Sequence, residues 1–301
     1  MTPLIHIWRM MCYEWFDALR SRRALVALLL YMVTSVGTMY GSISLLQKIE
    51  KELASVLQLP ASDNPGAITT TLWKSKPFQR IMRQVSKNKE VYDDIQGKSP
   101  IELIYAWLSF FYMPLLVALI ASNRIPEEMG SGAVRYIAFR TSRATWVLGK
   151  FLGQVSLLAL AVILSGLCAY LVARLRLGRY APLEIVWNMS FWALRAWIYS
   201  IPFVGLVMGL SLFTKSASKA TIFAILSLVV LSVITGLTTL FGGDTGWRAL
   251  LPYLAACFPS DYEMLLWRNN VQSLTTGSIF LLTLGFTYLG IGYTFFQKRD
   301  L

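Results

Sequence analysis

The side chains whose types and spacing could do chemistry gather between residues 127 and 150. This stretch opens with the adjacent carboxylates of Glu127 and Glu128. The positive charges that follow them are Arg135, Arg140, Arg143 and Lys150. A short helix here has one apolar face made of Val134, Ile137 and Ala138. Such a helix can seat in a groove of a cytosolic partner, or it can be a solvated connector that helps to set topology. The spacing alone does not decide between the two.

Catalysis by these side chains is not expected. Paired carboxylates can bind a metal ion when other ligands surround them, but this sequence has one histidine, His6, and three widely separated cysteines. A nucleotide-binding loop is also absent, because Gly149-Lys150 is followed by Phe151 where a Ser or Thr would hold magnesium. We therefore expect a protein that is not an enzyme, needs no cofactor and draws any nucleotide energy from another chain.

The composition places this stretch in a membrane protein. Of the 301 residues, 55% are hydrophobic and 15% are charged, whereas about a quarter of the residues in soluble domains are charged. The net charge of +12 fits Lys and Arg at the cytoplasmic ends of membrane spans and at anionic lipid headgroups. Binding of nucleic acid is not expected, since no basic run is interleaved with aromatic residues.

Six stretches without a charged residue are long enough to cross about 30 Å of hydrocarbon. They are 24–46, 103–122, 151–173, 196–213, 220–241 and 274–296. Each must be a helix, because lipid offers no hydrogen-bonding partner to the backbone. Pro114 and Pro202 fall inside two of them and should kink those helices. No charge lies deep in any of these stretches, which argues against a carrier driven by a proton or sodium gradient.

The chain is therefore expected to be a single all-α membrane domain, 1–301, with helical elements outside its spans. Residues 1–23 predict an interfacial amphipathic helix, whose apolar face is Leu4, Trp8, Met11, Trp15 and Leu19. The alternative is a soluble helix packed on a partner. The basic cluster Arg20, Arg22 and Arg23 beside the first span predicts that both termini and residues 123–150 are cytoplasmic.

Two longer segments are expected on the outer side. Residues 47–102 form a loop that should be partly helical, since Phe78, Ile81, Met82 and Val85 repeat at helical spacing. This loop could dock an outer partner or pack on the rim of the bundle. Residues 242–273 contain an apolar stretch, 249–259, that is too short to span and has a proline near each end, so a re-entrant or interfacial segment is expected.

Pairs of glycines four residues apart occur three times, at Gly37/Gly41, Gly149/Gly153 and Gly205/Gly209. Small residues at this spacing let two helices approach closely. Chance matches are common in membrane helices, so the spacing by itself does not say which pairs are packing sites.

The order of several short motifs resembles the permease subunits of type-2 ABC exporters. The matching residues are Glu128, Ser131-Gly132, Arg135-Tyr136, Thr141-Ser142-Arg143 and Gly149-Lys150, together with the basic segment 19–23 and the ending 295–301. Three features depart from the family pattern. The proline that usually precedes Ser-Arg is absent, and the connector is one residue short. The outer loop is longer than in compact drug exporters, which bears on the substrate class.

The resemblance implies the permease subunit of an ATP-binding-cassette exporter in the inner (plasma) membrane of a bacterium. A homo- or heterodimer of permeases would work with two cytosolic ATPase subunits. Residues 127–143 would be the coupling helix, and the implied ATPase contacts are Glu127, Glu128, Gly132, Arg135, Arg140, Arg143 and Lys150. The main alternative is a mechanical transducer, which moves no solute and passes ATP-driven motion through 47–102 to an extracytoplasmic protein.

Overall fold

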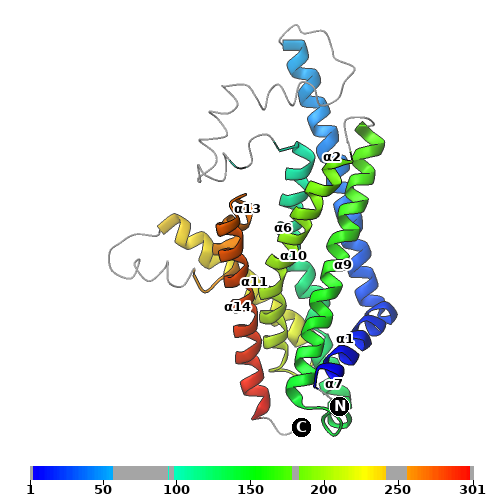
Figure 1. Cartoon of the computed structure of the whole chain (residues 1–301), viewed down its shortest axis with the longest axis vertical. Coiled ribbons are helices and arrows are strands. Elements are labelled where there is room, and N and C mark those ends of the chain that lie inside the picture. Colours follow the sequence, from blue (N-terminus) through cyan, green and yellow to red (C-terminus); the bar gives the residue numbers. More distant parts are fainter. Residues whose placement is uncertain (1–2, 57–93, 95–97, 178–182, 242–255, 299–301) are drawn as a thin grey trace.

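The computed structural model describes residues 3–56, 94, 98–177, 183–241 and 256–298. These residues form one elongated bundle of helices (Figure 1), and the described part contains no strand. The principal helices are α1 (Pro3–Arg20), α2 (Arg22–Val56), α6 (Pro100–Ala121), α7 (Arg124–Ser131), α8 (Ala133–Ala138), α9 (Arg143–Leu177), α10 (Glu184–Ser211), α11 (Ala217–Phe241) and α14 (Val271–Gln297). The short elements η3 (Pro259–Tyr262) and α13 (Glu263–Trp267) precede α14.

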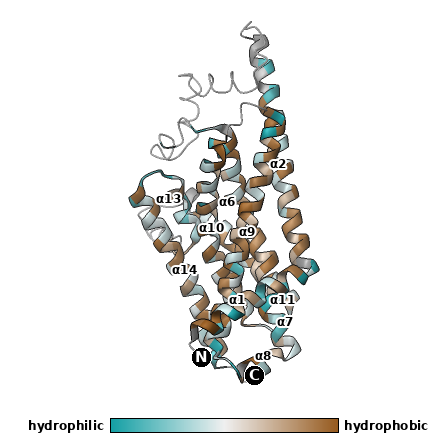
Figure 2. Ribbon diagram, turned by 45° about the vertical axis from the view of Figure 1, so that its right-hand side comes forward, coloured by the Kyte–Doolittle hydropathy of each residue, from teal (hydrophilic) through white to brown (hydrophobic). Residues whose placement is uncertain are grey.

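The expected all-α membrane fold with six spans is confirmed, because six helices are long and apolar enough to cross a membrane. Apolar residues, drawn in brown, recur along these helices (Figure 2). Large apolar side chains such as Val26, Ile163 and Phe286 are exposed on the bundle, as a lipid-facing surface requires. The first turn of α1 and the last turn of α14 lie at the same end (Figure 1), which we call the α1 end.

Helix α10 is the interior helix of the bundle. It packs against α6, α9, α11 and α14, and Val204 and Met208 on it are fully buried. The predicted start of this span at residue 196 was wrong, since α10 begins at Glu184. Arg195 marked the edge of the charge-free stretch, but its guanidinium lies over the Trp192 ring at 4.5 Å and donates to the Leu266 carbonyl at 3.1 Å. A charge satisfied in this way is compatible with a continuous helix.

The helices also extend beyond the other charge-free stretches. Helix α9 begins at Arg143, so Lys150 lies about two turns inside it. The sequence had placed Lys150 just before the start of this span. Helix α2 continues to Val56, ten residues past the predicted end of the first span at 46. It extends further from the α1 end of the bundle than the other labelled helices (Figure 1). The predicted helical repeat at 78–85 lies outside the described residues, as does most of the apolar stretch 249–259.

Glycines decide where two pairs of helices touch. A Cβ atom built on Gly205 would lie 2.1 Å from the Gly285 carbonyl oxygen, so α10 and α14 approach backbone to backbone. Gly149 on α9 faces α1 in the same way, since its Cβ would lie 2.4 Å from the Met10 Cβ. Gly41, by contrast, has nothing within 4 Å in the single chain. Two of the three glycine pairs are therefore packing sites within the chain.

Candidate functional site

The helix expected at residues 1–23 is present as α1, but one face of it is turned toward the protein. Leu4, Trp8 and Leu19 of the predicted apolar face are exposed, and the membrane contact expected for them stays a prediction. A neighbouring face, which carries Met10 and Glu14, packs on α9 at Gly149 and Gly153, where a Cβ on Gly153 would lie 2.7 Å from the Glu14 Cβ. The close approach brings the carboxylate of Glu14 against α9.

Glu14 is buried in this helix contact, with only 1% of its surface exposed. One carboxylate oxygen pairs with the ammonium group of Lys150, and the other accepts a hydrogen bond of 2.9 Å from the Gln154 side-chain amide. Lys150 and Gln154 are one turn apart on α9, so a single face of that helix holds both carboxylate oxygens. A buried carboxylate needs such partners, because burial without them is costly.

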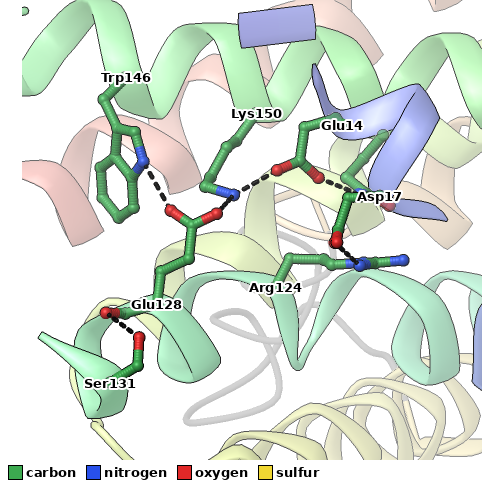
Figure 3. Close-up of polar contacts among 8 residues, drawn as sticks. Glu14, Asp17, Arg124, Glu128, Ser131, Trp146 and Lys150 are labelled. Carbon is green, nitrogen blue, oxygen red and sulfur yellow. Dashed lines mark hydrogen bonds and ion pairs between the residues drawn. The ribbon is translucent and has the colours of Figure 1, made fainter. Parts of the chain in front are cut away.

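Lys150 also pairs with a second carboxylate, which comes from α7. Its Nζ atom lies 2.6 Å from Oε1 of Glu128, and Oε2 of Glu128 accepts a hydrogen bond of 3.0 Å from the Trp146 indole. Lys150 is 2% exposed and Glu128 is 19% exposed. Figure 3 shows the ammonium group between the two carboxylates. Glu14, Lys150 and Glu128, which we call the ionic triad, therefore join α1, α9 and α7.

A second ion pair fixes α7 to α1 beside the ionic triad. Arg124 is 5% exposed and pairs with Asp17 of α1, as Figure 3 also shows. Arg124 and Glu128 are one turn apart on α7, so the same face of this short helix makes both attachments. On its other side, a Cβ on Gly130 would lie 2.8 Å from the Lys215 carbonyl oxygen, before α11. Helix α7 is thus held between α1, α9 and the α10–α11 turn.

The segment expected as one coupling helix, 127–143, is two short helices. Gly132 separates α7 from α8 with a φ of 76°, a left-handed conformation that glycine adopts at low cost. The turn directs α8 away from the ionic triad. Glu127 is exposed on α7, and Arg135 and Arg140 are exposed on and just after α8. Two aromatic side chains next to these arginines are also exposed, Tyr136 at 78% and Phe139 at 89%. We call these five residues the exposed knob.

Arg143 belongs to neither group. Its guanidinium donates to the backbone carbonyls of Gln297 at 3.0 Å and of Phe296 at 3.4 Å, at the end of α14. It also lies over the Phe296 ring at 5.7 Å. A positive charge at a helix C-terminus stabilises the unpaired carbonyls and the dipole of that helix. The observed contacts of Arg143 therefore tie the start of α9 to the end of α14.

The structure thus divides the seven residues singled out in the sequence. Three lie on the exposed knob, namely Glu127, Arg135 and Arg140. Gly132 makes the turn, while the side chains of Glu128, Arg143 and Lys150 make contacts within the chain. Lys150 is 2% exposed in the single chain, and its contact with an ATPase stays a prediction. The side chain does not reach the surface, because the carboxylates of two other helices enclose it.

The sequence did not identify the α1 partners of Lys150 and Arg124. Those partners, Glu14 and Asp17, are more than 100 residues away from α7 and α9 in the chain. A carboxylate among the apolar residues of an interfacial helix was the available signal. Trp146 and Phe139 were also missed, since aromatic residues near a span are common at the membrane interface. In the described part of the chain, no group of His, Cys, Asp and Glu residues could hold a metal ion.

The comparison with protein families gives one match. A family model described as ABC-2 family transporter protein matches residues 8–301. The matched region includes most of α1 and all of α7, α8 and α9, so all three residues of the ionic triad lie within it. A search of curated proteins found no match.

Proposed function

Since this chain belongs to the ABC-2 transporter family, we propose that it couples ATP hydrolysis by a separate cytosolic ATPase to the export of a substrate. The chain is the membrane-spanning permease subunit of such a transporter. Two permease copies and two ATPase subunits would form the working assembly. The α1 end of the bundle would face the cytosol, where the ATPase subunits are found.

The exposed knob supports this proposal by its shape and chemistry. Tyr136 and Phe139 are the kind of large, exposed aromatic side chains that anchor protein interfaces. Arg135 and Arg140 flank them and can pair with carboxylates around a groove. The knob lies between two membrane spans, α6 and α9, so a partner bound there is connected directly to both.

The ionic triad is the observation that carries the proposal. A docking surface can transmit motion only if it is fixed to the elements that must move. Glu128 on α7 is bonded through Lys150 to α9 and through the same ammonium group to Glu14 on α1. Because buried, hydrogen-bonded charges resist separation, a displacement of the knob would move α1 and α9 as one rigid body. Closure of the two ATPases would supply that displacement.

The first experiment tests the docking surface with exposed residues that have no part in the ionic triad. The double variant R135E/R140E reverses two charges on the knob, and K48E/K51E is the matched control on α2, away from the α1 end. Each variant is purified in mild detergent, the chains that co-purify are identified, and the ATPase rate is measured. We expect an ATPase subunit with wild type and with K48E/K51E, and a loss of at least about fivefold in co-purified ATPase with R135E/R140E.

Two results would overturn the proposal. One is the absence of any ATPase subunit from the wild-type preparation under conditions in which the membrane dimer is intact. The other is an unchanged amount and rate of ATPase with R135E/R140E. Thermal unfolding of each variant shows that a loss of partner does not come from a loss of fold.

A further inference from the structure

A cavity of about 770 Å³ lies between α6, α10 and α11 and extends to η3 and α13. Its α6 lining comes from residues 107–115 and its α11 lining from residues 225–235. Both stretches lie in the middle of their helices, and no residue of the ionic triad or the exposed knob lines the cavity. The cavity is therefore separate from the ionic triad and the exposed knob. Its volume lies within the range of about 300–1,000 Å³ that is typical of small-molecule sites.

Aromatic rings form one side of this cavity. The five aromatic residues that line it are Trp107, Phe110, Phe111, Tyr199 and Phe203. Trp107 stacks on Phe111 with a centroid distance of 5.4 Å and an interplanar angle of 11°. The Tyr199 ring lies 5.1 Å from both Phe110 and Phe203. The aromatic faces present negative charge density, which attracts cations.

Among the described residues that line the cavity, Glu263 is the single charged one. Its carboxylate oxygens accept hydrogen bonds of 3.3 Å from the Tyr199 hydroxyl and of 3.3 Å from the Trp267 indole. The ion pairs found among the described residues do not include Glu263. Burial raises the pKa of this carboxyl group above its usual value, because no positive charge offsets the loss of water. A bound cation would supply that charge.

The lining excludes several other kinds of ligand. An anion would meet the carboxylate and no basic side chain among the described lining residues. A bare metal ion needs several oxygen ligands around it, whereas here one carboxylate stands among apolar groups. A sugar needs many hydrogen-bonding partners. Besides Glu263 and Tyr199, the described polar side chains of the lining are Trp107, Ser232, Thr235 and Ser260. Two of these, Thr235 and Ser260, bond to each other at 2.8 Å. A neutral hydrocarbon would leave the carboxylate without a counter-charge.

We propose that this cavity binds a hydrophobic organic cation, such as an aryl- or alkyl-substituted ammonium or phosphonium ion. The positive centre lies at Glu263 and the apolar substituents lie against the rings of α6 and α10. The role of this ligand as the exported substrate rests on the proposed function, while its binding does not. Cation binding at aromatic rings and a half-buried carboxylate is favourable because both attract the charge and neither requires it to keep a full shell of water.

The test compares two probes of the same shape and opposite charge, tetraphenylphosphonium and tetraphenylborate. The full-length protein is placed in nanodiscs without choline lipids, and equilibrium binding of each radiolabelled probe is measured. Empty nanodiscs give the partition into lipid, which is subtracted. We expect saturable binding of the phosphonium and at least about tenfold weaker binding of the borate. Equal affinity for the two ions, or a phosphonium signal that does not exceed lipid partition, overturns the proposal.

One variant locates the charge, and a second is its control. E263Q keeps the shape of the side chain and removes its charge, so we expect the phosphonium affinity to fall about five- to tenfold and the borate affinity not to fall. D261N removes an exposed carboxylate two residues away that does not line the cavity, and it should leave both affinities unchanged. An unchanged phosphonium affinity in E263Q, or an equal loss in D261N, refutes the assignment of Glu263.

F111L separates binding from folding, because Phe111 is 62% exposed and is not needed for the core. We expect a loss of about threefold in phosphonium affinity with an unchanged unfolding temperature, and no loss of affinity in F111L argues against the aromatic wall. ATP-dependent phosphonium flux in vesicles then separates the two proposals. Saturable binding without such flux in an assembly that contains its ATPase overturns the cation as substrate and leaves the site. Flux that is unaffected by E263Q overturns the site and leaves the proposed export.

Discussion

Removal of the charge on Lys150 should be among the most destabilising single changes in this chain. K150M keeps the length of the side chain and leaves two carboxylates, Glu14 and Glu128, near each other without their shared cation. Loss of one partner from a buried ion pair costs about 3–5 kcal/mol, whereas exposed pairs contribute about 0–1 kcal/mol. The buried range applies to Glu14, since both side chains of that pair are at most 2% exposed.

The two carboxylates are not equivalent, which fixes an order of effects. E14Q leaves Lys150 paired with Glu128, and E128Q leaves it paired with the more deeply buried Glu14. We therefore expect the free energy of unfolding to fall most in K150M, by about 3–5 kcal/mol, less in E14Q, and least in E128Q, whose carboxylate is 19% exposed. The exposed lysine in K298M is the control and should change the free energy of unfolding by less than about 0.5 kcal/mol.

The assay is reversible unfolding of the purified protein in mixed micelles, followed by tryptophan fluorescence as the denaturing detergent is increased. A neutral triad, E14Q/K150M/E128Q, completes the series, because replacement of a whole buried ionic group by neutral groups is often close to neutral. We expect it to recover most of the stability lost in K150M. A loss in K150M below about 1 kcal/mol, or a triple variant no more stable than K150M, would refute this account of the ionic triad.

Three further predictions follow from other parts of the bundle. G149A should lower the unfolding temperature, since its Cβ would overlap α1. G41A has open space around its Cβ and should raise the free energy of unfolding by about 0.5–1 kcal/mol. A shift of the unfolding temperature in the same direction for both variants would contradict the packing argument. Y136A/F139A should weaken ATPase co-purification at least about tenfold without a change in unfolding temperature, because both side chains are exposed, and retention of the ATPase would contradict the knob. Phosphonium affinity should fall as the pH falls through the raised pKa of Glu263, since protonation removes the carboxylate charge. The variant E263Q should abolish this pH dependence. A wild-type affinity that is constant from pH 8 down to about 4.5, the usual pKa of a Glu carboxyl group, would exclude Glu263 as the titrating group.

The spans were predictable because the rule behind them is local. A segment that crosses lipid must be apolar, uncharged and helical whatever its neighbours are, so composition along the chain located all six. Their ends were less predictable. Arg195 and Lys150 marked apparent boundaries, but a neighbouring helix satisfies each charge, by the Leu266 carbonyl in one case and by Glu14 in the other. A helix continues through a charge when tertiary contacts compensate it.

The family could also be predicted from the sequence, since the order of short motifs from Glu128 to Lys150 resembles that of type-2 ABC exporters. The family match confirms this prediction. The roles of the individual residues could not be predicted in the same way. Charge and spacing predicted a short amphipathic helix, and the resemblance implied one coupling helix over 127–143, whereas the structure has two short helices joined at Gly132. The positive φ of that residue turns Arg135 toward solvent, while Glu128 on the preceding helix faces the bundle.

The sequence by itself determined that this chain spans a membrane, which family it belongs to and where along the chain its charges lie, because hydropathy and motif order are properties of the chain alone. Only the tertiary structure decided which of those charges are buried and which are exposed. Glu14 and Lys150 are 136 positions apart, and no local pattern relates them. They meet because glycines on α9 let α1 approach closely enough for a carboxylate and an ammonium group to be buried together.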